Sequence, residues 1–214
     1  MAMAKTSEEP RRDPAGDGLL APGNCVLALI DFQPGQYATV RSSPVELIDL
    51  NVRALCELAT AFEVPVVLST VGVDMGVNEG TVDFIRRALT GVEEIDRTGV
   101  NAWEDADFRA AVEATGRSRV VVAGLWTEVC VTFPTLDMLA AGYRVYPVVD
   151  AIGGVSETAH RAAIGRMTQA GASPVTAVGW GCELMRNWAR PEADGLRRVM
   201  SWYFPRLREL SDTR

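Results

Sequence analysis

The sequence predicts a doubly wound α/β domain, in which a mainly parallel, Rossmann-like sheet of six strands is flanked by helices. Short apolar segments alternate with segments of helical periodicity along most of the chain. The apolar segments are too uniformly hydrophobic for strands with one solvated face, so we expect them to be buried on both faces. Helices between such strands give right-handed βαβ units and a parallel sheet.

The first half of the chain supplies three of the expected strands. Residues 25–30 form an apolar run that ends at Asp31, and residues 45–62 then repeat apolar side chains every three or four positions, as a helix requires. A second apolar run covers residues 64–68. The remaining expected elements of this half are a helix over 81–89, a strand over 92–95 and a helix over 104–115.

The second half continues the alternation. The strongly apolar residues 119–123 predict a strand, and residues 127–141 predict a helix that stops at Gly142, since glycine is favoured just after a helix end. The last expected elements are a strand over 143–149, a helix over 156–170 and a sixth strand over 175–178.

Length and composition indicate one domain with two tails. The chain has 214 residues, of which 48% are hydrophobic. We expect a flexible N-terminal arm over 1–22, a single domain over 23–202 and a C-terminal tail over 203–214. The net charge of −7 argues against nucleic acids or anionic membranes as partners, because both require a basic surface. No apolar run is long enough for a membrane span, and the first residues lack a secretory signal.

Histidine and cysteine usage narrows the chemistry further. The chain has one histidine, His160, and four cysteines, Cys25, Cys56, Cys130 and Cys182. No two cysteines form a CxxC pair, and a histidine-based zinc site needs more than one histidine. The wide spacing predicts free thiols in a reducing cytoplasm. We interpret His160 as structural, on the outer side of the sheet.

In sheets of this type the ligand binds at the carboxyl ends of the strands. The residues expected there are Asp31, Ser69, Thr70, the segment 124–130 and Asp150. Cys130 is the candidate nucleophile, because Thr127 can act as a helix N-cap and the first helical turn favours a thiolate. The alternative is a buried structural cysteine. Pro134 predicts that this helix kinks or starts as a short turn and resumes.

Two further candidates carry charge. Asp31 could accept a proton from a thiol, although a turn aspartate that bonds its own backbone is the alternative reading, and the same alternative applies to Asp150. Arg97 could hold a thiolate ionised or bind an oxyanion, although most arginines lie on the surface.

These segments carry a resemblance to the isochorismatase-like cysteine hydrolases. The segment 27–33 (LALIDFQ) resembles that family's first-strand motif, and 123–131 (AGLWTEVCV) resembles its nucleophile motif. The segment 97–103 (RTGVNAW) resembles the part that holds the family's basic residue. The segments 141–145, 149–151, 166–171 and 182–184 extend the resemblance over about residues 24–200, and the YcaC-type branch is the most similar.

The resemblance implies a catalytic triad of Asp31, Arg97 and Cys130, with arginine where most members have lysine. It also implies a cis peptide at Leu125–Trp126, which would aim the Trp126 and Cys130 amides into one oxyanion hole. Gln33 and the Trp126 side chain would line the substrate pocket. No metal or other cofactor is expected, because the Asp and His metal site of nicotinamidases has no counterpart in a chain with one histidine.

The expected reaction is hydrolysis of a small amide through a Cys130 thioester, on a small-molecule substrate whose identity stays open. Isochorismatase-type vinyl ether hydrolysis and a non-catalytic binding or scaffold protein are the alternatives. We expect the Cys130 thiol to have a lower pKa than the other three thiols. Five tryptophans and the multimeric state of the YcaC-type branch predict a homo-oligomer.

Overall fold

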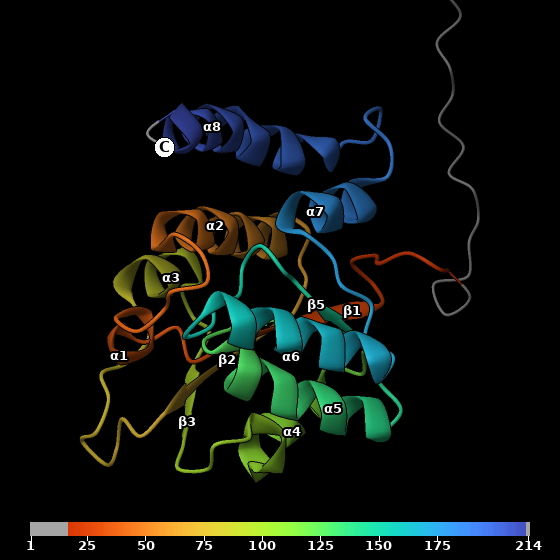
Figure 1. Cartoon of the computed structure of the whole chain (residues 1–214). Helices are drawn as coiled ribbons and strands as arrows, with labels where there is room; N and C mark the ends of the chain where they lie inside the picture. The colour runs from red at the N-terminus through yellow and green to blue at the C-terminus, as the bar shows by residue number, and fades with distance from the viewer. Residues whose placement is uncertain (1–16, 213–214) are drawn as a thin grey trace, which may run out of the picture.

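The computed structural model describes residues 17–212, and its centre is a parallel sheet (Figure 1). The sheet has five strands: β1 (Cys25–Ile30), β2 (Val66–Val71), β3 (Glu94–Arg97), β4 (Arg119–Gly124) and β5 (Arg144–Pro147). Their order is β3-β2-β1-β4-β5, and every neighbouring pair is parallel. The prediction of an α/β domain around a parallel sheet is therefore confirmed.

The predicted sixth strand over 175–178 is wrong, so the sheet has five strands rather than six. Val175 forms only an isolated bridge with Val148. The next residue, Thr176, is already the N-cap of a helix, because its hydroxyl accepts a hydrogen bond from the Gly179 amide at 3.2 Å. The apolar residues that follow belong to that helix, which begins at Ala177.

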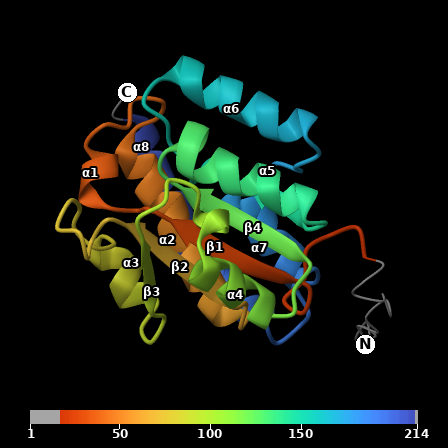
Figure 2. The ribbon, with the colours of Figure 1, turned by 90° about the horizontal axis from the view of Figure 1, so that it is seen from below.

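Helices cover both faces of the sheet (Figures 1 and 2). One side holds α2 (Val45–Ala61), α7 (Ala177–Met185) and α8 (Ala193–Asp212), and the other holds α4 (Ala106–Ala114), α5 (Thr132–Ala140) and α6 (Glu157–Gln169). The shorter elements are α1 (Pro34–Tyr37), α3 (Asp83–Ala88), the 3-10 turn η1 (Ala102–Glu104) and the π-helical turn η2 (Thr127–Val131). Helices of residues 17–212 are all too short or too polar to cross a membrane.

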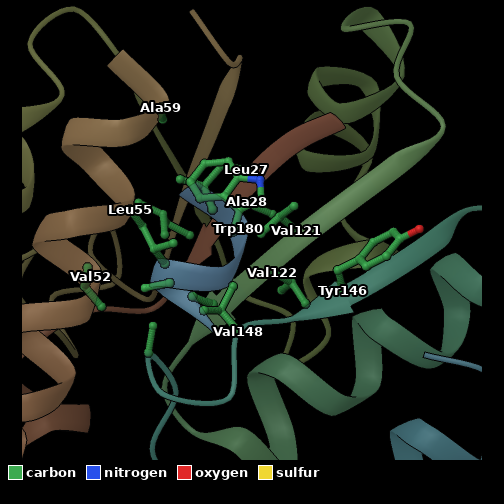
Figure 3. Packing of buried hydrophobic residues seen from close by; sticks show 14 of the residues in the cluster. Leu27, Ala28, Val52, Leu55, Ala59, Val121, Val122, Tyr146, Val148 and Trp180 are labelled. Carbon is green, nitrogen blue, oxygen red and sulfur yellow. The ribbon is translucent and has the colours of Figure 1, made fainter. Parts of the chain in front are cut away.

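The core on the α2 side is centred on Trp180, which is fully buried. Its indole lies beside Leu55 of α2 and Leu27 of β1 (Figure 3). β1 and β4 are buried along their whole length, as the apolar sequence predicts for central strands. Burial of this kind stabilises the two strands whose ends carry the candidate site.

For residues 17–22, the prediction of a flexible N-terminal arm over 1–22 is wrong. Residues 1–16 lie outside the described part of the chain, but residues 17–22 pack against the domain. Leu20 is fully buried, and the Arg119 guanidinium donates to the backbone carbonyls of Asp17 and Leu19. Arg186 adds an ion pair with the Asp17 carboxylate at 2.9 Å. The domain therefore begins before residue 23.

The C-terminal tail predicted over 203–214 is also wrong for the residues that the structure describes. α8 continues to Asp212, and Pro205 lies inside it on an exposed face. Leu196, Val199 and Tyr203 form its buried stripe. The Tyr203 hydroxyl donates to the Asn51 side chain at 2.6 Å, so the region after residue 202 is part of the domain.

The strand order reverses direction between β1 and β4. β2 and β3 extend the sheet on one side of β1, and β5 extends it beyond β4. The crevice outside the carboxyl ends of such a strand pair is the usual ligand site of an open α/β sheet. Asp31 follows β1 there, and the segment that leads to Cys130 follows β4.

Candidate active site

Asp31 is the first residue after β1, and its side chain is fully buried. Its φ of 59° places it in the left-handed region, which aspartate tolerates better than most residues. Its amide donates to the Ser69 carbonyl at 2.9 Å, and its own carbonyl accepts the Gln33 amide at 2.8 Å. This backbone turn directs the carboxylate into the interior instead of continuing the strand.

Arg97 is the last residue of β3, and its side chain is also fully buried. Nη1 and Nη2 donate to the two Asp31 carboxylate oxygens, each at 2.7 Å, so the pair is bidentate. Nη1 also donates to Ser69 Oγ at 3.0 Å and to the Thr70 carbonyl at 2.9 Å, and Nη2 donates to the Val100 carbonyl at 3.3 Å. The guanidinium is therefore a fixed counter-ion to Asp31, and the surface alternative for Arg97 is wrong.

Cys130 lies in the π-helical turn η2, which joins β4 to α5. The helix predicted over 127–141 thus starts as a short turn and resumes at Thr132, which is one of the two outcomes that Pro134 predicted. Pro134 is the third residue of α5, where a helix does not need its amide donor. The N-cap predicted at Thr127 is wrong, because the cap position of η2 is Trp126 and no side chain caps it.

Cys130 is 6% exposed, and its thiol lies close enough to the Asp31 carboxylate for that charge to act on it. Burial raises the pKa of this thiol, and the charge and hydrogen bond of Asp31 raise it further, whereas the Trp126 amide and Arg97 lower it. Burial also raises the pKa of Cys25 to about 11 and that of Cys56 to about 12. The expectation of a depressed Cys130 pKa is therefore wrong: a buried thiol beside a carboxylate keeps its proton.

Trp126 contributes both its backbone and its ring to the site. The Leu125–Trp126 peptide is cis, as the family resemblance implies. The Trp126 backbone lowers the pKa of the Cys130 thiol, which places its amide near the candidate nucleophile. The indole Nε1 donates to Thr39 Oγ1 at 2.8 Å and to the Gln36 carbonyl at 3.2 Å, so the ring is held against α1.

The side-chain amide of Gln33 is bound to backbone groups, so it has no free hydrogen-bonding group to offer a substrate. It is fully buried, and its Nε2 donates to the carbonyls of Val71 and Glu79, at 3.2 and 2.7 Å. Its Oε1 accepts the Val71 amide at 3.0 Å. The amide group is thus engaged with the end of β2 and the loop that follows it, and a place for Gln33 in the substrate pocket stays a prediction.

The other polar residues expected at this edge have structural partners. Ser69 Oγ contacts Arg97, and Thr70 Oγ1 donates to Asp96 at 2.9 Å. Asp150 accepts the Ala177 amide at 2.9 Å and so supports the start of α7. For Asp150, the structural reading that the sequence left open is the one the geometry favours. The described residues contain no cluster of three or more His, Cys, Asp or Glu side chains suited to a metal ion.

The sequence reading missed one contact to the nucleophile turn. His160 lies on α6, and its Nδ1 is 2.8 Å from the Thr127 hydroxyl. The interpretation of His160 as a structural residue on the outer side of the sheet did not include this contact. The order of the elements does predict that α5 and α6 lie near each other, because both follow strands whose carboxyl ends meet at the same edge of the sheet. The hydrophobic periodicity of the sequence does not show which face of α6 is turned toward η2.

Comparison with known proteins identifies the family. The model of the isochorismatase domain matches residues 25–178. The probable hydrolase YcaC of Escherichia coli K12 is 37% identical over 188 residues, which cover 87% of this chain and 89% of that protein.

Solved structures agree with this result. The YcaC gene product of E. coli, described as an octameric hydrolase of unknown specificity, superposes with a TM-score of 0.84 at 36% identity, covering 92% of this chain and 96% of that one. YcaC from Pseudomonas aeruginosa, solved with hexane-2,5-diol and covalent acrylamide, gives a TM-score of 0.83 at 35% identity and the same coverage. The chain with the Asp31, Arg97 and Cys130 cluster belongs to the isochorismatase-like hydrolase family.

Proposed function

We propose that this protein is a metal-free cysteine hydrolase that cleaves the C–N bond of a small amide through a Cys130 thioester. One observation carries the proposal: the Asp31 carboxylate is held by both terminal nitrogens of Arg97, and the buried Cys130 thiol lies close enough for the Asp31 charge to act on it. A fixed carboxylate beside a protonated thiol is the arrangement that general-base activation of a nucleophile requires.

The raised pKa of Cys130 determines how the first step would proceed. Little thiolate exists at neutral pH, so the thiol proton moves to Asp31 as the sulfur attacks the amide carbonyl carbon. A C–S bond forms and the carbonyl π electrons move onto oxygen. Arg97 keeps its charge throughout, because a guanidinium is not deprotonated in proteins. Its role is to hold Asp31 in place.

Collapse of the tetrahedral intermediate then breaks the C–N bond. The proton on Asp31 passes to the leaving nitrogen, which departs as an amine or ammonia and leaves a thioester on Cys130. Water attacks the thioester while Asp31 accepts one of its protons, and the carboxylic acid leaves as the sulfur recovers a proton. The net change is one amide and one water to one acid and one amine.

Backbone donors would stabilise the tetrahedral oxyanion. The Trp126 amide already contacts the Cys130 sulfur, so it lies close to where that oxygen develops. The Cys130 amide is the expected second donor. Fixed donors of this type are worth about 2.7–4 kcal/mol each in barrier height.

Two observations support a small electrophilic substrate. Asp31, Arg97 and Cys130 are nearly inaccessible, which favours a compact reacting group. The P. aeruginosa relative was solved with covalent acrylamide, a small amide whose alkene reacts with thiols. A reactive cysteine of the proposed kind accounts for such an adduct.

The proposal is tested by release of ammonia or amine from a panel of small amides. We expect turnover in the wild-type chain and in Cys182→Ala, whose cysteine is exposed and distant from the triad in sequence, and none in Cys130→Ala. Amide turnover by Cys130→Ala would contradict the covalent route, whereas activity of both proteins on a vinyl ether and on none of the amides would favour vinyl ether hydrolysis. An inert wild-type chain would favour the scaffold alternative.

We also propose a cytoplasmic homo-oligomer, an octamer like that of the E. coli relative. The tryptophan argument for this state is weak, since Trp103 and Trp180 lie in the chain's own core. Better support comes from large apolar side chains that the isolated chain exposes, namely Leu19, Met75, Val77, Val100, Val155, Trp188 and Phe204. Light scattering at micromolar concentration is expected to give eight times the chain mass, and a monomer would contradict it.

A further inference from the structure

The first residue of the nucleophile turn, Thr127–Val131, is held in place by hydrogen bonds. Thr127 is fully buried, and its amide donates to the Gly153 carbonyl at 2.9 Å. Its carbonyl accepts the Thr132 hydroxyl at 2.6 Å, and its own hydroxyl contacts His160 Nδ1 at 2.8 Å. Every polar group of Thr127 thus has a partner, and the only partner on α6 is the ring of His160.

The next residue of the turn is held by the loop that leads into α6. Glu128 Oε1 accepts the Val155 amide at 3.0 Å. The loop passes so close that a Cβ at Gly154 would lie 2.5 Å from Glu128 Oε2 and 3.2 Å from the His160 Cβ. The turn, the loop and α6 therefore form one tightly packed unit.

We propose that His160 is a positioning residue for the cysteine chemistry, acting through the Thr127 hydroxyl to fix the backbone that carries the Trp126 amide and the Cys130 thiol. The inference rests on the proposed function in one respect, that Cys130 is the nucleophile. The Trp126 amide and Cys130 lie on either side of Thr127 in the chain, so rotation at Thr127 displaces both relative to Asp31.

The geometry distinguishes this role from mere packing. Only the Nδ1 position of the ring contacts Thr127. An asparagine at 160 places an amide near Nδ1, where it can donate or accept, whereas a glutamine places its amide nearer Nε2. A role in packing predicts no preference between these two polar side chains.

The test is the rate at which acrylamide alkylates Cys130 in the full-length chain, followed by peptide mass spectrometry. Alkylation of the exposed Cys182 in the same sample serves as the internal reference. We expect His160→Asn to stay near the wild-type rate and both His160→Gln and His160→Ala to lose about tenfold or more, since small displacements of reacting groups have large effects on rate. Arg161→Ala is the matched control, because Arg161 lies next in the chain and forms only an exposed ion pair with Glu157.

A second pair of variants changes Thr127, the other residue of the contact. These variants keep the inference testable if a His160 variant fails to fold. Thr127→Ser keeps the hydroxyl and should retain the wild-type rate, whereas Thr127→Val should lose as much as His160→Gln. Wild-type rates in folded His160→Gln and Thr127→Val would overturn the inference alone. A wild-type chain that releases no amine from the amide panel, or a Cys130→Ala variant with wild-type turnover, would overturn the proposed function, and the inference with it.

Discussion

Arg97 binds both carboxylate oxygens of Asp31 at 2.7 Å, and neither side chain has any exposed surface. A buried, bidentate ion pair of this kind fixes the direction of the carboxylate, whose orientation relative to the nearby Cys130 thiol is then set by the protein rather than by solvent. The pair comes from strands that are not neighbours, since β2 lies between β1 and β3. The geometry of the candidate site thus depends on the sheet itself.

Replacing Arg97 tests whether the two parallel hydrogen bonds of its guanidinium contribute to turnover beyond its positive charge. Arg97→Lys keeps the charge but cannot form two parallel hydrogen bonds, so we expect impaired but measurable turnover. Arg97→Ala should raise the barrier by roughly 2–4 kcal/mol. It should also lower the free energy of unfolding by about 3–5 kcal/mol, because Asp31 would remain buried and unpaired. Steady-state kinetics and urea unfolding measure the two effects, and equal turnover in all three proteins would contradict the account.

Asp31→Asn is expected to separate thiol reactivity from hydrolysis. Asp31 raises the pKa of Cys130 through its charge and its hydrogen bond, while Arg97 lowers it. The variant removes the first influence and keeps the second, so the thiolate should form at lower pH. We expect iodoacetamide to alkylate Cys130 faster at neutral pH, while amide turnover is lost with the general base. An alkylation profile whose midpoint stays in place or moves to higher pH would show that Asp31 does not control this thiol.

Gln33 should act on stability more than on substrate affinity. Gln33→Met removes two hydrogen bonds to the backbone of Val71 at the end of β2 and one to Glu79 in the following loop, and leaves buried groups unpaired. We expect a loss of about 1–3 kcal/mol in the free energy of unfolding and faster amide hydrogen exchange over residues 71–79. Gln169→Met, on an exposed position of α6, is the control. Unchanged exchange in the loop would mean that Gln33 does not hold it.

Two adjacent leucines test whether the segment before β1 belongs to the folded domain. Leu20 is fully buried, whereas Leu19 is 42% exposed. Leu20→Ala should lower the free energy of unfolding by about 2–5 kcal/mol, and Leu19→Ala should change it by less than about 0.5 kcal/mol. Thermal and urea unfolding of both variants give the comparison. Similar small effects at both positions would favour the flexible arm that composition alone predicts.

The sequence predicted the parts of this site that follow from strand ends. Buried strands that run parallel bring their carboxyl ends to one edge, and that rule is enough to bring Asp31 and Cys130 together. Placing Arg97 beside them needed the family resemblance, because β3 is short and only weakly apolar.

The errors of the sequence reading have physical causes as well. Pro205 and many charged residues made the last residues resemble a tail, yet the buried stripe of Leu196, Val199 and Tyr203 makes them a helix. The expectation of a low pKa for Cys130 took account of its position near a helix start but not of the burial of its thiol, which raises the pKa. The contact between His160 and Thr127 depends on how α6 is rotated, which is decided by tertiary packing.

The central claim, that Cys130 forms a thioester, is tested most directly by acid-quenched mass spectrometry of the enzyme during turnover of a small primary amide. The account predicts an acyl group on the peptide that contains Cys130, present during turnover and absent once the substrate is consumed. The same peptide from Asp31→Asn should stay unacylated, because no acid remains to protonate the leaving nitrogen. Sustained turnover with Cys130 unmodified at every quench time, and with Cys130→Ala equally active, would contradict the claim.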